Sequence, residues 1–130
     1  MIADTSFLID IMENDPSAVK KAGEIEGSGQ TLSVGAPTIF ELYVGLSLSK
    51  KPEEETRKIV DVLSALPQYP LDFASASSGG VIYGMKMRTG FKMDPEDAMI
   101  AGIARTYKEK IVTRNVKHFR GIDGVSVETY

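Results

Sequence analysis

The chain has 130 residues, of which 42% are hydrophobic and 25% charged, a composition that fits one globular domain and excludes disordered, collagen-like and fibrous proteins. It has no cysteine, so disulfides, zinc–thiolate sites and thiol nucleophiles are excluded and a reducing, cytoplasmic location is expected. The net charge of −3 is unevenly divided, because residues 1–85 carry 6 basic and 12 acidic side chains whereas residues 86–130 carry 9 and 6.

Neither a leader nor a membrane segment is expected. Asp4 and Asp10 interrupt the first apolar stretch, and no basic region precedes it, so it does not read as a signal peptide. No segment approaches the roughly 20 consecutive apolar residues that a membrane span needs. We therefore expect a cytoplasmic protein without membrane contact.

Short apolar runs, too short for helices, predict the strands of a sheet. They are Met1–Asp4, Thr31–Val34, Tyr69–Leu71, Ile111–Thr113 and Val125–Val127. Helical patterns separate these runs, and such alternation is typical of a parallel sheet covered on both faces, with right-handed crossovers. We predict a single domain over residues 1–130, with a three-layer α/β/α fold and a mainly parallel sheet of about five strands.

Proline marks the start of the helices predicted in the first half. Asp15-Pro16 is an N-cap followed by proline, and its helix ends in the loop Gly27–Gly29. Pro37 and Pro52 begin two more helices, the second with three glutamates in its first turn, where they suit the helix dipole. The predicted buried stripes are Ile39, Leu42, Tyr43 and Leu46 on the former, and Ile59, Val62, Leu63 and Leu66 on the latter.

Two helices are predicted in the second half. Residues 73–88 have a helical pattern, although each of three glycines within it costs about 1 kcal/mol relative to alanine. Asp94-Pro95 repeats the cap-plus-proline pattern before residues 98–104. The small side chains of that segment favour close packing of its helix on the sheet.

Carboxylates supply the chemistry that this sequence favours. Asp4 ends the first predicted strand, at the carboxyl edge where α/β sheets bind ligands, and Glu41 and Asp97 lie near the starts of predicted helices. Acids without histidine or cysteine suit a hard cation such as Mg²⁺ or Mn²⁺, which can promote phosphodiester hydrolysis. Each acid also has a structural alternative, namely a helix cap for Asp4, a first-turn acid for Asp97 and a solvated position for Glu41.

Other chemistry is poorly represented. No G-x-S-x-G turn, Walker A loop or G-x-G-x-x-G motif occurs, which disfavours serine hydrolases, nucleotide-driven enzymes and dinucleotide oxidoreductases. His118 is the only histidine, and a surface or packing role is expected for it. Asp10, Asp72 and Asp94 are expected to be caps, turn residues or surface acids.

Four segments together resemble a known family. They are Asp4-Thr5-Ser6, residues 40–45 around Glu41, residues 90–101 around Asp97, and residues 113–119, and they cover nearly the whole chain in order. In this arrangement the chain resembles the PIN-domain ribonucleases, particularly the VapC-like toxins of type II toxin–antitoxin pairs. The resemblance implies that Asp4, Glu41 and Asp97 bind the metal of a Mg²⁺- or Mn²⁺-dependent endoribonuclease whose products carry a 5′-phosphate and a 3′-hydroxyl.

The chain departs from many family members at Asn115, where they place a fourth acid. An amide oxygen can orient a water molecule but adds no negative charge, so we expect weaker binding of a second metal and include Asn115 in the catalytic set. The hydroxyls of Thr5, Ser6 and Thr113 are predicted to hold the carboxylates in position, with local capping as the alternative.

RNA contacts are expected from the basic second half, first from Arg114 and Lys117, unless these cations are simply solvated. The resemblance also implies a small antitoxin partner and a homodimer, for which apolar residues between 37 and 66 can supply a groove. A solitary RNA-processing nuclease and a non-catalytic PIN-like domain that binds RNA or a protein remain alternatives. A haloacid-dehalogenase-like phosphatase is disfavoured because Ser6 stands where such enzymes need a second acid.

Overall fold

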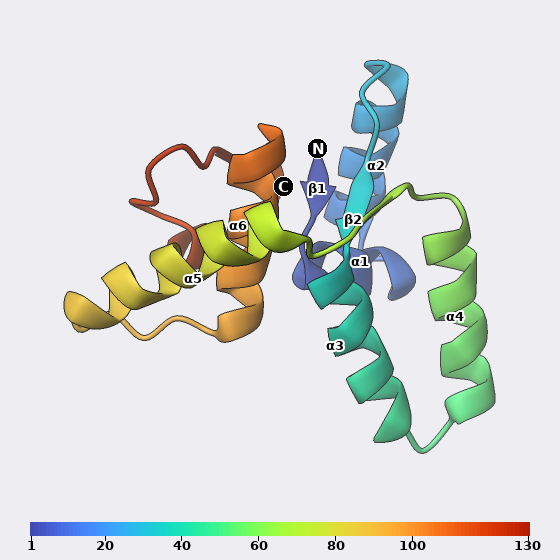
Figure 1. The fold of residues 1–130 in the computed structure, drawn as a ribbon. Helices are drawn as coiled ribbons and strands as arrows, with labels where there is room; N and C mark the ends of the chain where they lie inside the picture. Colours follow the sequence, from blue (N-terminus) through green and yellow to red (C-terminus); the bar gives the residue numbers. More distant parts are fainter.

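The computed structural model describes residues 1–130 as a five-stranded, all-parallel sheet with the strand order β3-β2-β1-β4-β5 (Figure 1). The strands are β1 (Ile2–Ala3), β2 (Ser33–Gly35), β3 (Gln68–Tyr69), β4 (Ile111–Val112) and β5 (Val127–Glu128). All five predicted strands are present, each within about two residues of its predicted position. The central strand β1 pairs with β2 on one side and with β4 on the other, so residues that follow β1 and β4 lie side by side.

Six α-helices and one short 3₁₀ helix connect the strands. They are α1 (Thr5–Met12), α2 (Pro16–Gly27), α3 (Ala36–Ser47), α4 (Pro52–Ser64), α5 (Phe73–Arg88), α6 (Pro95–Tyr107) and the 3₁₀ helix η1 (Val116–His118). The Asp15 side chain caps α2 as predicted, accepting a hydrogen bond of 3.0 Å from the Ala18 N–H. Asp94 is the N-cap residue of α6 and is followed by proline, as predicted, although its side chain makes no capping hydrogen bond. None of the helices has the length and apolar character that crossing a membrane requires.

The sheet carries an apolar core on each face. Ile2 and Ala3 of β1 are both fully buried, but they belong to different cores because successive side chains of a strand point to opposite faces. Helices α1, α2, α3 and α4 contribute to the core around Ala3, and α5 and α6 to the core around Ile2. Figure 1 shows the two groups of helices on either side of the strands. This arrangement confirms the predicted three-layer α/β/α fold.

Helix α5 is continuous despite its three glycines. One of them, Gly79, lies where α5 crosses α6 and leaves no room for a side chain. A Cβ atom at Gly79 would lie 2.9 Å from the Ala98 carbonyl oxygen, and one at Gly102 would lie 2.4 Å from the Ser75 carbonyl oxygen. The two helices therefore approach each other closely through glycine. The small residues of α6 serve this contact with α5 in addition to the predicted packing on the sheet.

One side of α3 exposes apolar side chains. Tyr43, which was predicted to be buried, is 44% exposed, so that part of the predicted stripe is wrong. With Phe40, Val44 and Leu48 it forms what we call the α3 apolar face, on which Phe40 is 62% and Leu48 79% exposed. Leu42 is buried as predicted.

Candidate active site

Asp4 is held at the carboxyl end of β1 by three hydrogen bonds. One carboxylate oxygen accepts from the Phe7 N–H at 3.0 Å and from the Ser6 hydroxyl at 2.8 Å, so Asp4 does cap α1. The other oxygen accepts from the Thr113 hydroxyl, which β4 brings alongside. Burial raises the pKa of the Asp4 carboxyl above its ordinary value although these hydrogen bonds act to lower it. Asp4 is therefore both a helix cap and a buried acid with one oxygen only partly engaged.

Glu41 projects from α3 toward the end of β1. Its Oε1 accepts a hydrogen bond of 2.6 Å from the Thr5 hydroxyl, so the first residue of α1 fixes the glutamate of α3. Burial raises the pKa of the Glu41 carboxyl, and the negative charges of nearby Glu96, Asp4 and Asp94 raise it further, against the lowering by Thr5. A solvated helix position does not describe this residue.

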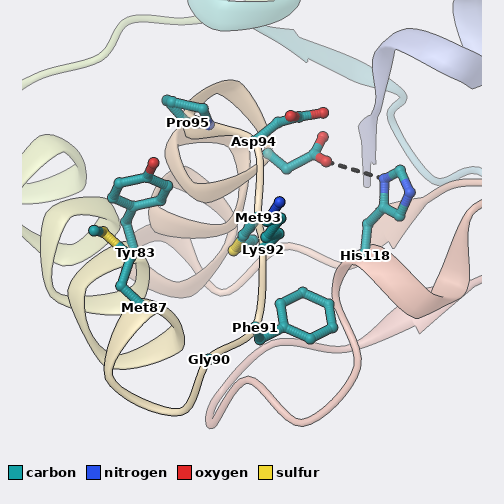
Figure 2. Close-up of a pocket in the computed structure, with 10 residues that line it drawn as sticks. Tyr83, Met87, Gly90, Phe91, Lys92, Met93, Asp94, Pro95 and His118 are labelled. Carbon is teal, nitrogen blue, oxygen red and sulfur yellow. Dashed lines mark ion pairs between the residues drawn. The ribbon is translucent and has the colours of Figure 1, made fainter.

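Asp97 lies in the first turn of α6 and contacts the only histidine. Its Oδ2 lies 3.0 Å from Nδ1 of His118, an ion pair when the imidazole is protonated (Figure 2). Burial raises the pKa of Asp97 to about 6; the positive charge of His118 opposes this shift, and the charges of Glu41, Asp94 and Asp4 add to it. The expectation of a surface or packing role for His118 missed this contact, because nothing in the sequence links positions 97 and 118.

The three carboxylates act on one another electrostatically. Asp4 and Glu41 each raise the pKa of Asp97, and Asp4 raises that of Glu41. Asp4 directly follows β1, and the next residue, Thr5, donates a hydrogen bond to Glu41, so these two acids lie at the same edge of the sheet. In this conformation no three acidic or histidine side chains lie close enough together to share one ion. The donor set nevertheless suits a hard divalent cation, because it consists of carboxylate oxygens whose mutual repulsion such a cation would relieve. The residues therefore fit the expected metal in the chemistry of their donor atoms.

Asn115 lies beside this group, just after β4. Its backbone N–H donates a hydrogen bond of 2.9 Å to the Thr113 hydroxyl, which itself donates to Asp4. Its side chain makes no capping hydrogen bond to η1. The amide is thus left available near Asp4, and its catalytic role stays a prediction.

Comparison with known proteins identifies the family of this chain. A model of the PIN domain matches residues 1–125. The chain belongs to the PIN-domain family. It is 30% identical over 127 residues to a protein described as tRNA(fMet)-specific endonuclease VapC from Shigella flexneri, covering 98% of this chain and 95% of that protein. It is 26% identical over 132 residues to Ribonuclease VapC2 from Rickettsia felis, with the same coverage.

Solved structures show the same likeness. DNA-bound VapBC from Salmonella typhimurium is 27% identical, with a TM-score of 0.87 over 98% of this chain and 96% of that chain. VapBC2 from Rickettsia felis, bound to a DNA fragment from its promoter, has a TM-score of 0.89 at 22% identity over 99% and 97% of the two chains, which shows a shared fold. The resemblance to VapC-like PIN-domain proteins is confirmed.

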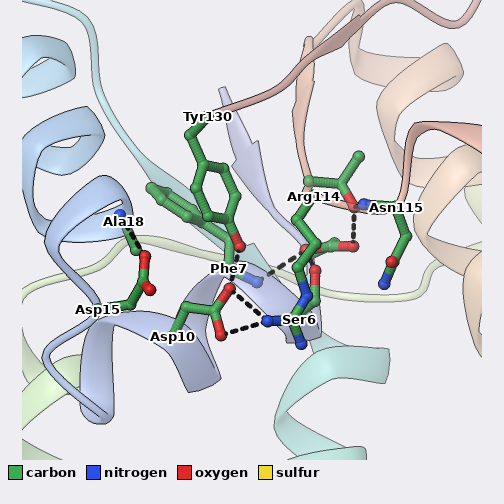
Figure 3. A network of polar contacts seen from close by, with 10 residues as sticks. Ser6, Phe7, Asp10, Asp15, Ala18, Arg114, Asn115 and Tyr130 are labelled. Atoms are coloured by element: carbon green, nitrogen blue, oxygen red, sulfur yellow. Dashed lines mark hydrogen bonds and ion pairs between the residues drawn. The ribbon is translucent and has the colours of Figure 1, made fainter.

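In this PIN domain Asp10 is not the surface acid that was expected. It is 8% exposed, and its carboxylate accepts hydrogen bonds of 2.7 and 2.9 Å from Nη1 of Arg114 and one of 2.5 Å from the Tyr130 hydroxyl (Figure 3). The Tyr130 ring also packs on Phe7, with ring centroids 4.8 Å apart. Burial and the Asp10 carboxylate raise the pKa of the Tyr130 hydroxyl, which keeps it a donor. The network ties the last residue of the chain to α1, beside Asp4.

The basic residues of the second half do not form one free patch. Several are engaged within the protein, namely Lys86 with the Arg120 carbonyl, Arg105 with Ser78, Lys110 with Glu128, and Arg114 with Asp10. The Arg114 side chain remains 54% exposed, and Lys117 is exposed without an ion-pair partner. Both are still able to contact RNA, which stays a prediction.

Proposed function

We propose that this PIN domain is an endoribonuclease that hydrolyses RNA phosphodiester bonds with Mg²⁺ or Mn²⁺, as the toxin of a toxin–antitoxin pair. The observation that carries the proposal is the group of Asp4 after β1, Glu41 on α3 and Asp97 in the first turn of α6. Burial raises the pKa of each of these carboxyls, and Glu41 and Asp97 are raised further by neighbouring negative charges. Its family membership and its similarity to proteins described as VapC ribonucleases support RNA as the substrate.

The carboxylates of Asp4, Glu41 and Asp97 would hold the cation. When bound, a divalent cation neutralises charge on the phosphate and lowers the pKa of water. Two hydroxyls orient these acids: Thr113 donates a hydrogen bond to one oxygen of Asp4, and Thr5 donates one to an oxygen of Glu41. Both carboxylates keep lone pairs that could bind a cation. His118 orients Asp97 in the same way.

Single-stranded or looped RNA fits this site best, because its phosphates can bend into an edge-of-sheet site that a rigid duplex does not enter. Arg114 and Lys117 are in place to contact the RNA backbone, Arg114 with the guanidinium nitrogens that Asp10 leaves free. Asp10 and Tyr130 then serve to fix Arg114 rather than to touch the substrate.

The α3 apolar face supports a protein partner. Its four side chains are 44% to 79% exposed. A contiguous exposed apolar surface of this kind often marks a site of protein–protein contact. Structural relatives described as VapBC complexes support a small antitoxin as a partner, for which this face is our candidate contact surface, and a homodimer of this chain is the second expected association. Gel filtration of the isolated chain measures the latter directly, and a monomeric mass would contradict it.

The deciding experiment is cleavage of a panel of structured RNAs by the full chain in Mn²⁺, in Mg²⁺ and in EDTA. Asp97→Asn keeps the size of the side chain and removes its charge, and we expect it to lower cleavage by more than about 100-fold, the upper end of what loss of an outer-shell partner costs. Asp61→Asn, at an exposed aspartate of α4, is the matched control and is expected to cleave normally.

The outcomes separate the alternatives. Cleavage that persists in EDTA or in Asp97→Asn would contradict the metal-dependent mechanism. Intact RNA in every condition, together with measurable RNA binding, would favour the non-catalytic domain for which Asn115 in place of an acid is the supporting feature.

A further inference from the structure

A cavity of about 500 Å³ opens beside Asp97, between α5 and the segment that leads into α6 (Figure 2). This volume lies within the range of small-molecule sites in proteins. Its apolar walls come from Tyr83 and Met87 of α5 and from Phe91 and Met93, whereas Asp97 and His118 line its other end. The cavity is therefore apolar at one end and continuous with the candidate active site at the other.

Phe91 is an aromatic residue that lines this cavity. It lies outside any helix or strand and is 39% exposed, so it contributes little to either core of the protein. The Nζ atom of Lys86 lies 4.7 Å from the centre of the Phe91 ring, and Lys86 does not line the cavity. The cation thus positions the ring from outside the cavity and leaves other ring surface facing into it.

Charge decides which part of a nucleotide suits the cavity. Asp94 and Asp97 both line it, so a second phosphate group within it would meet two carboxylates, offset by Lys92 and by His118, which is already paired with Asp97. A nucleobase is uncharged, planar and aromatic, and it stacks on aromatic side chains whatever its identity. The cavity favours the base of a nucleotide and excludes its phosphate.

We propose that this cavity binds the nucleobase adjacent to the phosphate that is cleaved, through stacking on Phe91. The inference rests on the proposed function, since it takes the scissile phosphate to lie at Asp4, Glu41 and Asp97. Asp97 belongs to both sites, so a phosphate held by the acids places its own nucleoside at the mouth of the cavity. Single-stranded RNA, whose bases are free to leave the stack, is the substrate that can use it.

The test compares ligands with and without a base. Ribose 5-phosphate and the four nucleoside 5′-monophosphates are titrated into the full chain in Mg²⁺, with binding followed by calorimetry or NMR. None of them contains a phosphodiester bond, so the proposed hydrolysis does not interfere. We expect at least one nucleotide to bind about 5-fold or more tightly than ribose 5-phosphate, the lower end of what stacking of one base supplies.

Variants locate this advantage. Phe91→Ala removes the ring and should make that nucleotide bind no better than ribose 5-phosphate, whereas Phe91→Trp keeps a stacking surface and should preserve the difference. Phe91→Leu retains apolar bulk without a ring and replaces Phe91→Ala if that variant does not fold. Phe91→Leu should then bind the nucleotide no better than ribose 5-phosphate. Phe73→Ala, at the 89% exposed phenylalanine that begins α5, is the matched control and should behave as wild type.

Equal binding of all five ligands by wild type, or an advantage that survives in Phe91→Ala, would overturn the proposal. Cleavage of the RNA panel by wild type, measured separately, distinguishes this from failure of the nuclease function. Cleavage together with equal binding of all five ligands would contradict the base-binding cavity alone. Nucleotide binding that depends on Phe91, without cleavage, would contradict the nuclease function and support a base-binding cavity.

Discussion

Helix α6 can approach α5 only because residue 102 is glycine, and Gly102→Ala tests this directly. The Cβ of alanine would lie 2.4 Å from the Ser75 carbonyl oxygen and 2.6 Å from the Gly79 nitrogen, where real Cβ atoms stay beyond 3.0 Å. Both atoms belong to the backbone, so no side chain can rotate out of the way. The helices must separate, and the core between α6 and the sheet must shift with them.

The expected effect is the sum of two opposing contributions. Alanine is favoured over glycine in a helix by about 1 kcal/mol. Overpacking of a tightly packed site costs about 1–3 kcal/mol and occasionally more, and a contact this short with backbone belongs at the upper end. We expect the free energy of unfolding to fall by about 1–2 kcal/mol, which for a chain of this length lowers Tm by roughly 4–8 °C.

The assay is thermal and urea unfolding followed by circular dichroism. Gly80→Ala is the matched control, because Gly80 is the neighbour of Gly79 on α5 and a Cβ there would meet nothing within 4 Å. That variant should be about 0.5–1 kcal/mol more stable than wild type. If Gly102→Ala proved as stabilising as Gly80→Ala, the close crossing of α5 and α6 would be refuted.

Three further changes test contacts near and far from the acids. Thr113→Val should lower the free energy of unfolding by about 1.5–3 kcal/mol and also lower RNA cleavage, because Asp4 loses a hydrogen bond to a buried carboxylate. Tyr130→Phe should lower the free energy of unfolding by about 1.5 kcal/mol in urea titrations, because Asp10 keeps only its Arg114 contacts. Asp72→Ala should lower Tm at neutral pH, and the difference from wild type should shrink in acid. Asp72 is the N-cap of α5, and its carboxylate accepts hydrogen bonds from the Ser75 N–H and hydroxyl. These hydrogen bonds hold the Asp72 pKa below 3.8, so the contribution of the cap is complete above that pH and is lost as the pH falls through the lowered value.

Each of these has a control or a contradicting result. Thr129→Val changes a threonine for which no hydrogen bond is found and should leave both stability and cleavage unchanged. If Tyr130→Phe unfolded in urea like wild type, the hydrogen bond of the Tyr130 hydroxyl to Asp10 would contribute nothing to stability. A Tm difference for Asp72→Ala that stays constant from neutral pH to pH 2 would exclude a contribution from the charged cap.

Much of the architecture was predictable because it depends on short-range patterns. Apolar runs of three or four residues located the strands. Cap-plus-proline pairs such as Asp15-Pro16 located helix starts, since a capping interaction joins residues three positions apart. Alternation of the two patterns then implied the parallel sheet. The same local logic located the start of α6 at Asp94-Pro95, although the Asp94 side chain makes no capping hydrogen bond. It failed at Tyr43, where the helical period predicts burial that the neighbouring elements do not provide.

By itself, the sequence determined that acids follow β1 and begin α6, and it favoured carboxylates over other residue types as the source of any chemistry. Only the tertiary structure decided which groups meet them. Thr113 reaches Asp4 because β4 and β1 are neighbours in the sheet. Tyr130, which follows β5, reaches Asp10 on α1 although 120 residues separate them along the chain, and His118 of η1 reaches Asp97 of α6. Contacts of that kind depend on strand order, which arises from the packing of two cores at once and leaves no local pattern to read.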